Sequence, residues 1–226
     1  MSIRQRFQDE TSYPAPADLV LAGLSPAPAH APKLDLPLPG GDGAGLWDVL
    51  RRRRSRRDYA GGGLSLEELG ALAWAAQGVT GGARNAVQRA APSAGGLHPL
   101  DLYAVLPGPE PAAGVWRYEP EGHRLRPALA GPALGELAKV ALGQPFVTKS
   151  AATFMLTAHP ERSAWRYLYL DAGHVGENIL LAAEALGLGA CAIGAFHDSA
   201  ANELLGVDGM NELVVYMVAV GLLEAG

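Results

Sequence analysis

An apolar run, "ILLAAEALGLGACAIGAF", spans residues 179–196 and restricts the folds open to this chain more than any other feature. Its length is close to that of a membrane-spanning helix. Glu184 and the glycines interrupt it, so we predict that the run divides into the end of a helix and a buried strand. The first residues, "MSIRQRFQDETSYP", lack the apolar core of a signal peptide. We therefore expect a cytoplasmic protein without a membrane segment.

The spacing of apolar residues predicts the other regular elements. We expect helices at 46–50, 64–78, 132–142, 163–189 and 199–206, and strands at 102–106, 115–120, 124–129, 151–158, 190–196 and 212–221. Ser65 and Glu68 match a capping box, and Gly78 is expected to end that helix. The turn "EPEGHR" predicts a hairpin, whereas residues 78–99 are expected to be a loop. Hairpins mixed with helical crossovers favour an α+β fold over a doubly wound parallel sheet.

Two compositional units follow one another along the chain. Residues 1–45 contain a proline-rich stretch, with seven prolines from Pro14 to Pro39. The prolines predict an extended arm, and the leucines among them predict that it lies along a protein surface, that of a partner subunit included. The alternative is a disordered tail. Residues 46–226 are predicted to form a single domain.

Charge and cysteine content narrow the possible functions. The formal net charge is -5, so general affinity for nucleic acid is not expected. Cys191 is the single cysteine, so no disulfide can form within the chain, and we expect it to act as a small hydrophobic residue. The six histidines show no metal-ligand spacing, so no metal site is expected.

Six arginines lie between residues 51 and 57, interrupted only by Ser55. They cannot all face one direction on a helix. Guanidinium groups bind phosphate through two parallel hydrogen bonds, and a serine hydroxyl adds another donor. The run is therefore a candidate phosphate site. The alternatives are a solvated basic face and a nucleic-acid contact.

A second candidate is the sequence "RAAPSAGGLHPL" at residues 89–100. Gly95 and Gly96 allow backbone angles and close approaches that a Cβ would prevent, and the flanking prolines stiffen the segment. Such a loop can present N–H groups and the Ser93 hydroxyl to a planar polar ligand. An ordinary surface turn is the alternative.

A third candidate is "GLGACAIGAF" at residues 187–196, where small residues surround Gly194. A ligand ring could rest on this backbone, although a tightly packed buried strand explains the same residues. On the preceding helix Asp171, His174 and Asn178 share one face, which we expect to be a hydrogen-bonded polar stripe. Two glycines of that helix predict close packing, including packing at a subunit interface: Gly173 and Gly176.

Taken together and in order, these three segments resemble the FMN-dependent nitroreductase superfamily, in the branch that contains SagB-type dehydrogenases. The similarity covers about residues 45–222. It implies a central, mostly antiparallel or mixed sheet flanked by helices, in an intertwined homodimer with FMN at the subunit interface. It also implies the FMN contacts: Arg53, Arg54, Ser55 and Arg57 for the phosphate and ribityl chain, Pro92, Ser93, Ala94, Gly95 and Gly96 as a loop from the other subunit, and Ile193, Gly194 and Ala195 facing flavin N5.

Two departures from the family pattern bear on function. Many relatives carry a C-terminal Lys or Arg that reaches the phosphate, whereas this chain ends "AVGLLEAG", so Arg89 or another arginine of the run would have to compensate. The azoline oxidases also carry a Lys–Tyr pair before the corresponding helix. Here the segment "HPERSAWRYLYLDAGH" has no lysine, and the remaining candidates are Arg166, Tyr167 and Tyr169.

The resemblance implies an FMN-dependent oxidoreductase that transfers hydride through flavin N5, with NAD(P)H as donor and a small molecule or peptide as acceptor. His98 is the nearest candidate proton donor, and a neutral structural histidine is the alternative. Two other functions stay open: a dehydrogenase that modifies a peptide or natural product, and a flavin-binding scaffold without turnover. The sequence identifies neither the acceptor nor the preferred nucleotide.

Overall fold

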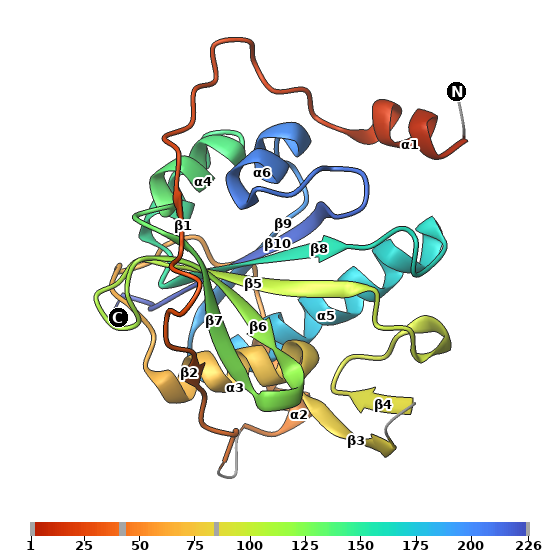
Figure 1. Cartoon of the computed structure of the whole chain (residues 1–226). Coiled ribbons are helices and arrows are strands. Elements are labelled where there is room, and N and C mark those ends of the chain that lie inside the picture. The colour runs from red at the N-terminus through yellow and green to blue at the C-terminus, as the bar shows by residue number, and fades with distance from the viewer. Residues whose placement is uncertain (1–2, 41–43, 84–85, 225–226) are drawn as a thin grey trace.

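The computed structural model describes residues 3–40, 44–83 and 86–224. A central sheet carries helices on both faces (Figure 1). Its strand order is β1-β7-β6-β5-β8-β10-β9, with β2 also paired to β7, and every pair is antiparallel. The predicted α+β fold with a mostly antiparallel sheet is confirmed. The strands are β1 (Ser25–Pro26), β2 (Leu34–Asp35), β5 (Leu100–Leu106), β6 (Gly114–Glu119), β7 (Arg124–Ala130), β8 (Ala152–Ala158), β9 (Gly189–Ile193) and β10 (Leu213–Gly221).

Two hydrophobic clusters, one on each face of the sheet, form the core. Helices α3 and α5 pack in the first cluster, and α4 and α6 in the second. Along β5, Leu102 and Ala104 belong to the first cluster, whereas Tyr103 and Val105 belong to the second. Because side chains alternate between faces and both faces are covered, the central strands are apolar at nearly every position. The helices are α1 (Ile3–Thr11), α2 (Leu46–Arg52), α3 (Leu66–Gln77), α4 (Leu134–Val140), α5 (Trp165–Ala185) and α6 (Asp198–Leu205).

Local sequence signals set the boundaries of the helices. The Glu68 backbone N–H donates to the Ser65 hydroxyl oxygen at 3.2 Å, and the Glu68 carboxylate accepts from the Ser65 N–H at 2.8 Å, which completes the predicted capping box. Helix α5 ends just before Gly187, whose φ of +76° suits glycine. The apolar run at 179–196 therefore divides between α5 and β9, as predicted. No helix in the described ranges is both long and apolar enough to cross a bilayer.

The prediction of a continuous loop over residues 78–99 is wrong. Strands β3 (Val79–Ala83) and β4 (Ala86–Arg89) pair there as a separate two-stranded sheet, which projects from the domain beside α3 (Figure 1). Glycines occupy the middle of β3, so the segment has no hydrophobic alternation to mark it. Backbone pairing does not require apolar side chains, and this is why periodicity missed the hairpin.

The proline-rich arm lies along its own domain. Strands β1 and β2 both pair with β7, and the arm runs down that edge of the sheet (Figure 1). Its upper part is held by polar contacts, since the Ala22 N–H donates to Glu136 and the Tyr13 N–H donates to Asp198, each at 2.9 Å. Before the arm, residues 3–11 form α1, a helix that the sequence analysis did not predict.

Candidate functional site

The arginine run begins on α2 and continues as an extended segment beside the sheet. Helix α2 ends at Arg52, and Arg53 is its C-cap. Ser55 then forms a parallel bridge with Ala190 of β9, and the Arg56 N–H donates to the Ala190 carbonyl at 2.9 Å. This backbone pairing places the arginine segment directly against β9, the strand that leads to Gly194.

An open groove of about 610 Å³ lies along the arginine segment. The C-terminal segment forms its other wall, because the Ala60 N–H donates to the Leu222 carbonyl at 2.9 Å and Tyr59 bridges Leu223. The C-terminus thus reaches the groove, as the resemblance implies, but it places Glu224 there instead of a cation. The groove is lined by Arg54, Ser55, Arg56, Arg57, Asp58, Leu223 and Glu224.

Several arginines of the run already have a carboxylate partner. Arg51 pairs with Asp48 at 2.6 Å, and Glu184 of α5 forms ion pairs with two of the others. Those two are Arg52, at 3.5 Å, and Arg56, at 3.8 Å. Arg53, one of the predicted phosphate ligands, lies 3.9 Å from Glu177 and outside the residues that line the groove.

Arg54 and Arg57 have no carboxylate partner among the ion pairs of the described residues. Arg54 donates to the backbone carbonyls of Arg51 and Arg53 at 2.9 and 2.7 Å. The Arg57 guanidinium lies 5.8 Å from the centroid of the Phe146 ring. Both charges are therefore available to an anion in the groove, and Ser55 lies between them in the sequence.

Cys191 of β9 lies beside the arginine segment. Its side chain is buried, and burial raises the pKa of the thiol, although Arg57 and Ser55 oppose that effect. A buried thiol that stays protonated fits the predicted role as a small hydrophobic residue.

The backbone opens to solvent directly after β9. Pairing with β10 ends where Ile193 meets Met217, and Gly194 follows as an exposed residue. A Cβ added to Gly194 would have the Tyr216 ring, 3.9 Å away, as its nearest contact. Among the hydrogen bonds of the described residues, none is donated by the N–H of Gly194 or Ala195 to a protein acceptor.

Asp171 of α5 holds the glycine-rich loop in place. Its carboxylate accepts from the Ser93 hydroxyl at 2.6 Å and from the Ala94 N–H at 3.2 Å. The Ser93 oxygen in turn accepts from the His98 N–H at 2.9 Å. The Ser93 hydroxyl is therefore already hydrogen-bonded to Asp171 and His98. The groups of this loop that are left to contact a ligand are backbone groups. Gly95 and Gly96 both have φ near +66°, the conformation that their residue type predicted.

The residues of the expected polar stripe on α5 do not form one hydrogen-bonded group. Asn178 donates to the Ala75 carbonyl of α3 at 2.9 Å, while His174 is exposed. Gly176 packs against the Tyr216 ring, where an added Cβ would approach to 2.5 Å. Gly173 has no neighbouring atom within 4 Å of such a Cβ, so within this chain it makes no close packing contact.

Arg89 and His98 lie apart from the arginine groove. Arg89 donates to Gln77 at 2.6 Å and to Glu121 at 3.2 Å, so in this chain its charge is engaged elsewhere. The His98 Nε2 lies 3.0 Å from the Val87 carbonyl, and burial lowers the pKa of the imidazole. Both observations fit a neutral histidine that donates to the backbone.

Within one chain the three predicted segments form two groups. The arginine segment pairs with β9 at Ala190, and β9 leads to residues 193–195, whereas the loop at 92–96 is fixed to α5 by Asp171. None of the hydrogen bonds that the described part of the chain makes joins that loop to the arginine segment.

The sheet order, the two helical layers and the groove beside β9 define a nitroreductase-like α+β protein. Residues 50–222 match the nitroreductase family model, and the chain belongs to the nitroreductase family. It is 35% identical over 182 residues to a candidate nitroreductase of Methanocaldococcus jannaschii, which covers 76% of this chain and 89% of that protein.

Solved structures agree with this assignment. A candidate nitroreductase from Ralstonia eutropha JMP134 has a TM-score of 0.74 at 25% identity, covering 95% of this chain and 99% of that one. A chain of the Escherichia coli microcin synthetase McbBCD complex, solved with truncated pro-MccB17, has a TM-score of 0.69 at 16% identity, with 99% and 92% covered. An FMN-dependent nitroreductase of Clostridium difficile R20291 has a TM-score of 0.55 at 19% identity, with 79% and 87% covered. The last two show similarity of fold alone.

Proposed function

We propose that this protein is an FMN-dependent oxidoreductase that takes electrons from NAD(P)H and passes them to a small-molecule or peptide acceptor in the cytoplasm. One observation carries the proposal: the groove presents two guanidinium groups without carboxylate partners among the described residues, Arg54 and Arg57, and the segment that bears them pairs with β9, the strand that leads to the open backbone at Gly194. When bound, FMN would supply hydride transfer at N5.

The groove and the backbone that follows β9 suit the two ends of FMN. A phosphate dianion would receive charge-assisted hydrogen bonds from Arg54 and Arg57 and one from the Ser55 hydroxyl. At the other end, the backbone after β9 has no Cβ at Gly194, so a planar ring could approach it closely. The N–H groups of Gly194 and Ala195 would then orient the ring edge, and the protein's share of catalysis is binding, orientation and electrostatics.

We further propose that the site is completed in a homodimer by the loop at 92–96 of a second subunit. In one chain this loop is held on α5 by Asp171, and among the described residues it makes no hydrogen bond to the arginine segment. Its glycines at φ near +66° give it a fixed shape with no bulky side chain, which suits one wall of a flavin pocket. The family resemblance implies the same division between subunits.

Spectroscopy of the purified protein tests this proposal. The protein should be yellow and should release FMN on denaturation, and anaerobic addition of NADH or NADPH should bleach the flavin absorbance. A colourless protein that also fails to bind added FMN would refute the cofactor assignment. Bound FMN that neither nucleotide reduces would instead favour the scaffold function, which the placement of Glu224 in the groove also favours.

A second candidate function is dehydrogenation of a peptide or natural product. It is favoured by the similarity in fold to a chain of the microcin synthetase complex over 99% of this chain. The segment at residues 159–174, which would correspond to the region of the Lys–Tyr pair of the azoline oxidases, contains Arg166, Tyr167 and Tyr169 but no lysine. If this function holds, a thiazoline- or oxazoline-containing peptide should bleach the bound flavin anaerobically without any nicotinamide nucleotide.

A further inference from the structure

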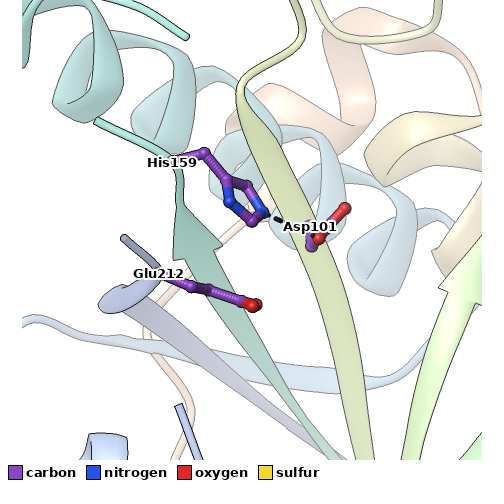
Figure 2. A group of neighbouring side chains, drawn as sticks. All are labelled: Asp101, His159 and Glu212. Atoms are coloured by element: carbon purple, nitrogen blue, oxygen red, sulfur yellow. Dashed lines mark hydrogen bonds and ion pairs between the residues drawn. The ribbon is translucent and has the colours of Figure 1, made fainter. Parts of the chain in front are cut away.

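Three side chains of metal-ligand type converge at one end of the sheet, away from the arginine groove. Asp101 lies near the start of β5, His159 directly follows β8, and Glu212 directly precedes β10. Figure 2 shows the three side chains projecting toward a common space from these neighbouring strands. Their ligand atoms lie within 4.8 Å of one another, and His159 is only 9% exposed.

The charges within this cluster are not balanced. Asp101 accepts from Arg117 at 2.6 Å and lies 2.9 Å from the His159 Nε2. Glu212, in contrast, accepts from two neutral hydroxyl groups of the described residues, those of Tyr103 at 2.9 Å and Thr157 at 2.7 Å, both through one oxygen. No ion pair in the described part of the chain involves Glu212. Arg117 attracts Glu212 but forms its hydrogen bond with Asp101. A partly buried carboxylate without a contacting cation is costly, and a bound metal ion would relieve that cost.

We propose that Asp101, His159 and Glu212 bind a divalent transition-metal ion, with Zn²⁺ as the best-suited ion. Imidazole nitrogen and carboxylate oxygen are both zinc ligands, and three protein ligands leave a fourth position for water. The two carboxylates outweigh the single charge of Arg117, so the site favours a dication. Zinc–ligand distances of about 2.0–2.2 Å require the ligand atoms to move somewhat closer together on binding.

The surroundings of the three ligands resemble the support that metal ligands usually have. Arg117 orients the Asp101 carboxylate, and Thr157 and Tyr103 hold one oxygen of Glu212 while the other stays available. The His159 Nδ1 lies 3.7 Å from the Glu161 carboxylate, an outer carboxylate of the kind that orients a metal-bound imidazole. A metal ion would then take the place of the direct contact between the His159 Nε2 and the Asp101 carboxylate.

The bound metal ion would connect strands that lie far apart in the sequence. The His159 N–H already donates to the Pro99 carbonyl at 2.9 Å, and Ala158 pairs with both Leu100 and Leu213. A metal bound here would join the start of β5, the end of β8 and the start of β10, at the base of the glycine-rich loop. The ligands are separated by dozens of residues, which explains why sequence spacing showed no metal motif.

Metal titration of the chelator-treated full-length protein tests this inference independently of the flavin. Zn²⁺ binding would be measured by calorimetry, and Co²⁺ would serve as a visible-absorbance probe of tetrahedral coordination. We expect one equivalent of Zn²⁺ per chain and a rise in Tm on binding. Glu212→Gln keeps an acceptor for Tyr103 and Thr157 but removes a ligand and its charge, so Zn²⁺ affinity should fall more than about tenfold.

His159→Ala should lose the site, and His174→Ala, at an exposed position on α5, is the matched control that should bind Zn²⁺ as the wild type does. If His159→Ala does not fold, Glu212→Gln decides the question alone. A wild-type protein that takes up no Zn²⁺, or a Glu212→Gln protein with unchanged affinity, overturns the proposal.

Discussion

The Ser93 hydroxyl donates a 2.6 Å hydrogen bond to the Asp171 carboxylate, across 78 residues of sequence. Asp171 is only 3% exposed and also accepts from the Ala94 N–H. The pair couples the middle of the long helix α5 to the glycine-rich loop. The shape of that loop therefore depends on a residue that does not belong to it.

Asp171→Ala should destabilise the fold and loosen the loop. Two donors would lose a charged acceptor in a buried place, which costs about 2 kcal/mol in the free energy of unfolding. Urea unfolding measures this change, and Asn178→Ala, whose side chain joins α5 to α3 elsewhere, controls for general loss of helix packing. An Asp171→Ala protein as stable as the wild type would contradict the structural role of the pair.

Arg57→Ala should weaken FMN binding by about ten- to hundredfold, because a charge-assisted phosphate contact contributes roughly 1.5–3 kcal/mol. Fluorescence quenching of FMN on titration with the flavin-free protein gives the Kd. Arg51→Ala is the control, since Arg51 pairs with Asp48 outside the groove and should leave the Kd unchanged. Equal losses in the two variants would indicate a general charge effect and not a phosphate site.

Gly194→Ala should lower the affinity for FMN, whereas Gly176→Ala should lower the stability of the fold. A Cβ at Gly194 meets only the Tyr216 ring at 3.9 Å, so stability should change little, whereas close approach of the flavin ring would be blocked and FMN affinity should fall. A Cβ at Gly176 meets that ring at 2.5 Å, so Tm should drop. Paired Tm and Kd measurements separate the two cases. Unchanged FMN affinity in Gly194→Ala would remove this residue from the site.

Glu224→Gln should tighten FMN binding about threefold or more at low ionic strength, because a carboxylate that lines the groove repels the phosphate. The gain should shrink as salt is added, since screening weakens the repulsion. Glu203→Gln on α6 removes an equal charge from outside the groove and should have no effect. An equal change of FMN affinity in both variants would show that the net charge of the protein, and not the position of Glu224, is responsible.

Stability should fall as the pH drops through the range just below 6.5, in part because of His98. Burial lowers the pKa of His98 from its ordinary value near 6.5, so the unfolded chain takes up a proton more readily than the folded one. The contribution of His98 to the free energy of unfolding is therefore complete above about pH 6.5, and it is lost as the pH falls toward the lowered pKa of the folded state. The pH dependence of the free energy of unfolding should be shallower in His98→Gln than in the wild type. Identical slopes would show that His98 does not contribute.

Much of the fold could be predicted because its signals are local. The capping box at Ser65, the left-handed glycines and the division of the apolar run near Gly187 all depend on residues close together in the sequence. The hairpin formed by β3 and β4 could not be predicted, because glycine-rich strands pair through backbone groups that carry no side-chain signal. Helix α1 also escaped prediction.

The sequence by itself determined which short segments have the chemistry of a flavin site, because residue type and order decide where arginines, glycines and small side chains occur. Only the tertiary structure decided how those groups are used. Packing of α5 against the arginine segment brought Glu184 to two of the arginines, and the bridge between Tyr59 and Leu223 placed Glu224 in the groove. Arg57 has no carboxylate partner among the described residues. Strand pairing joined Asp101, His159 and Glu212. The physical reason is that charge balance and hydrogen bonding depend on neighbours in space, and the antiparallel sheet makes those neighbours out of residues far apart in the chain.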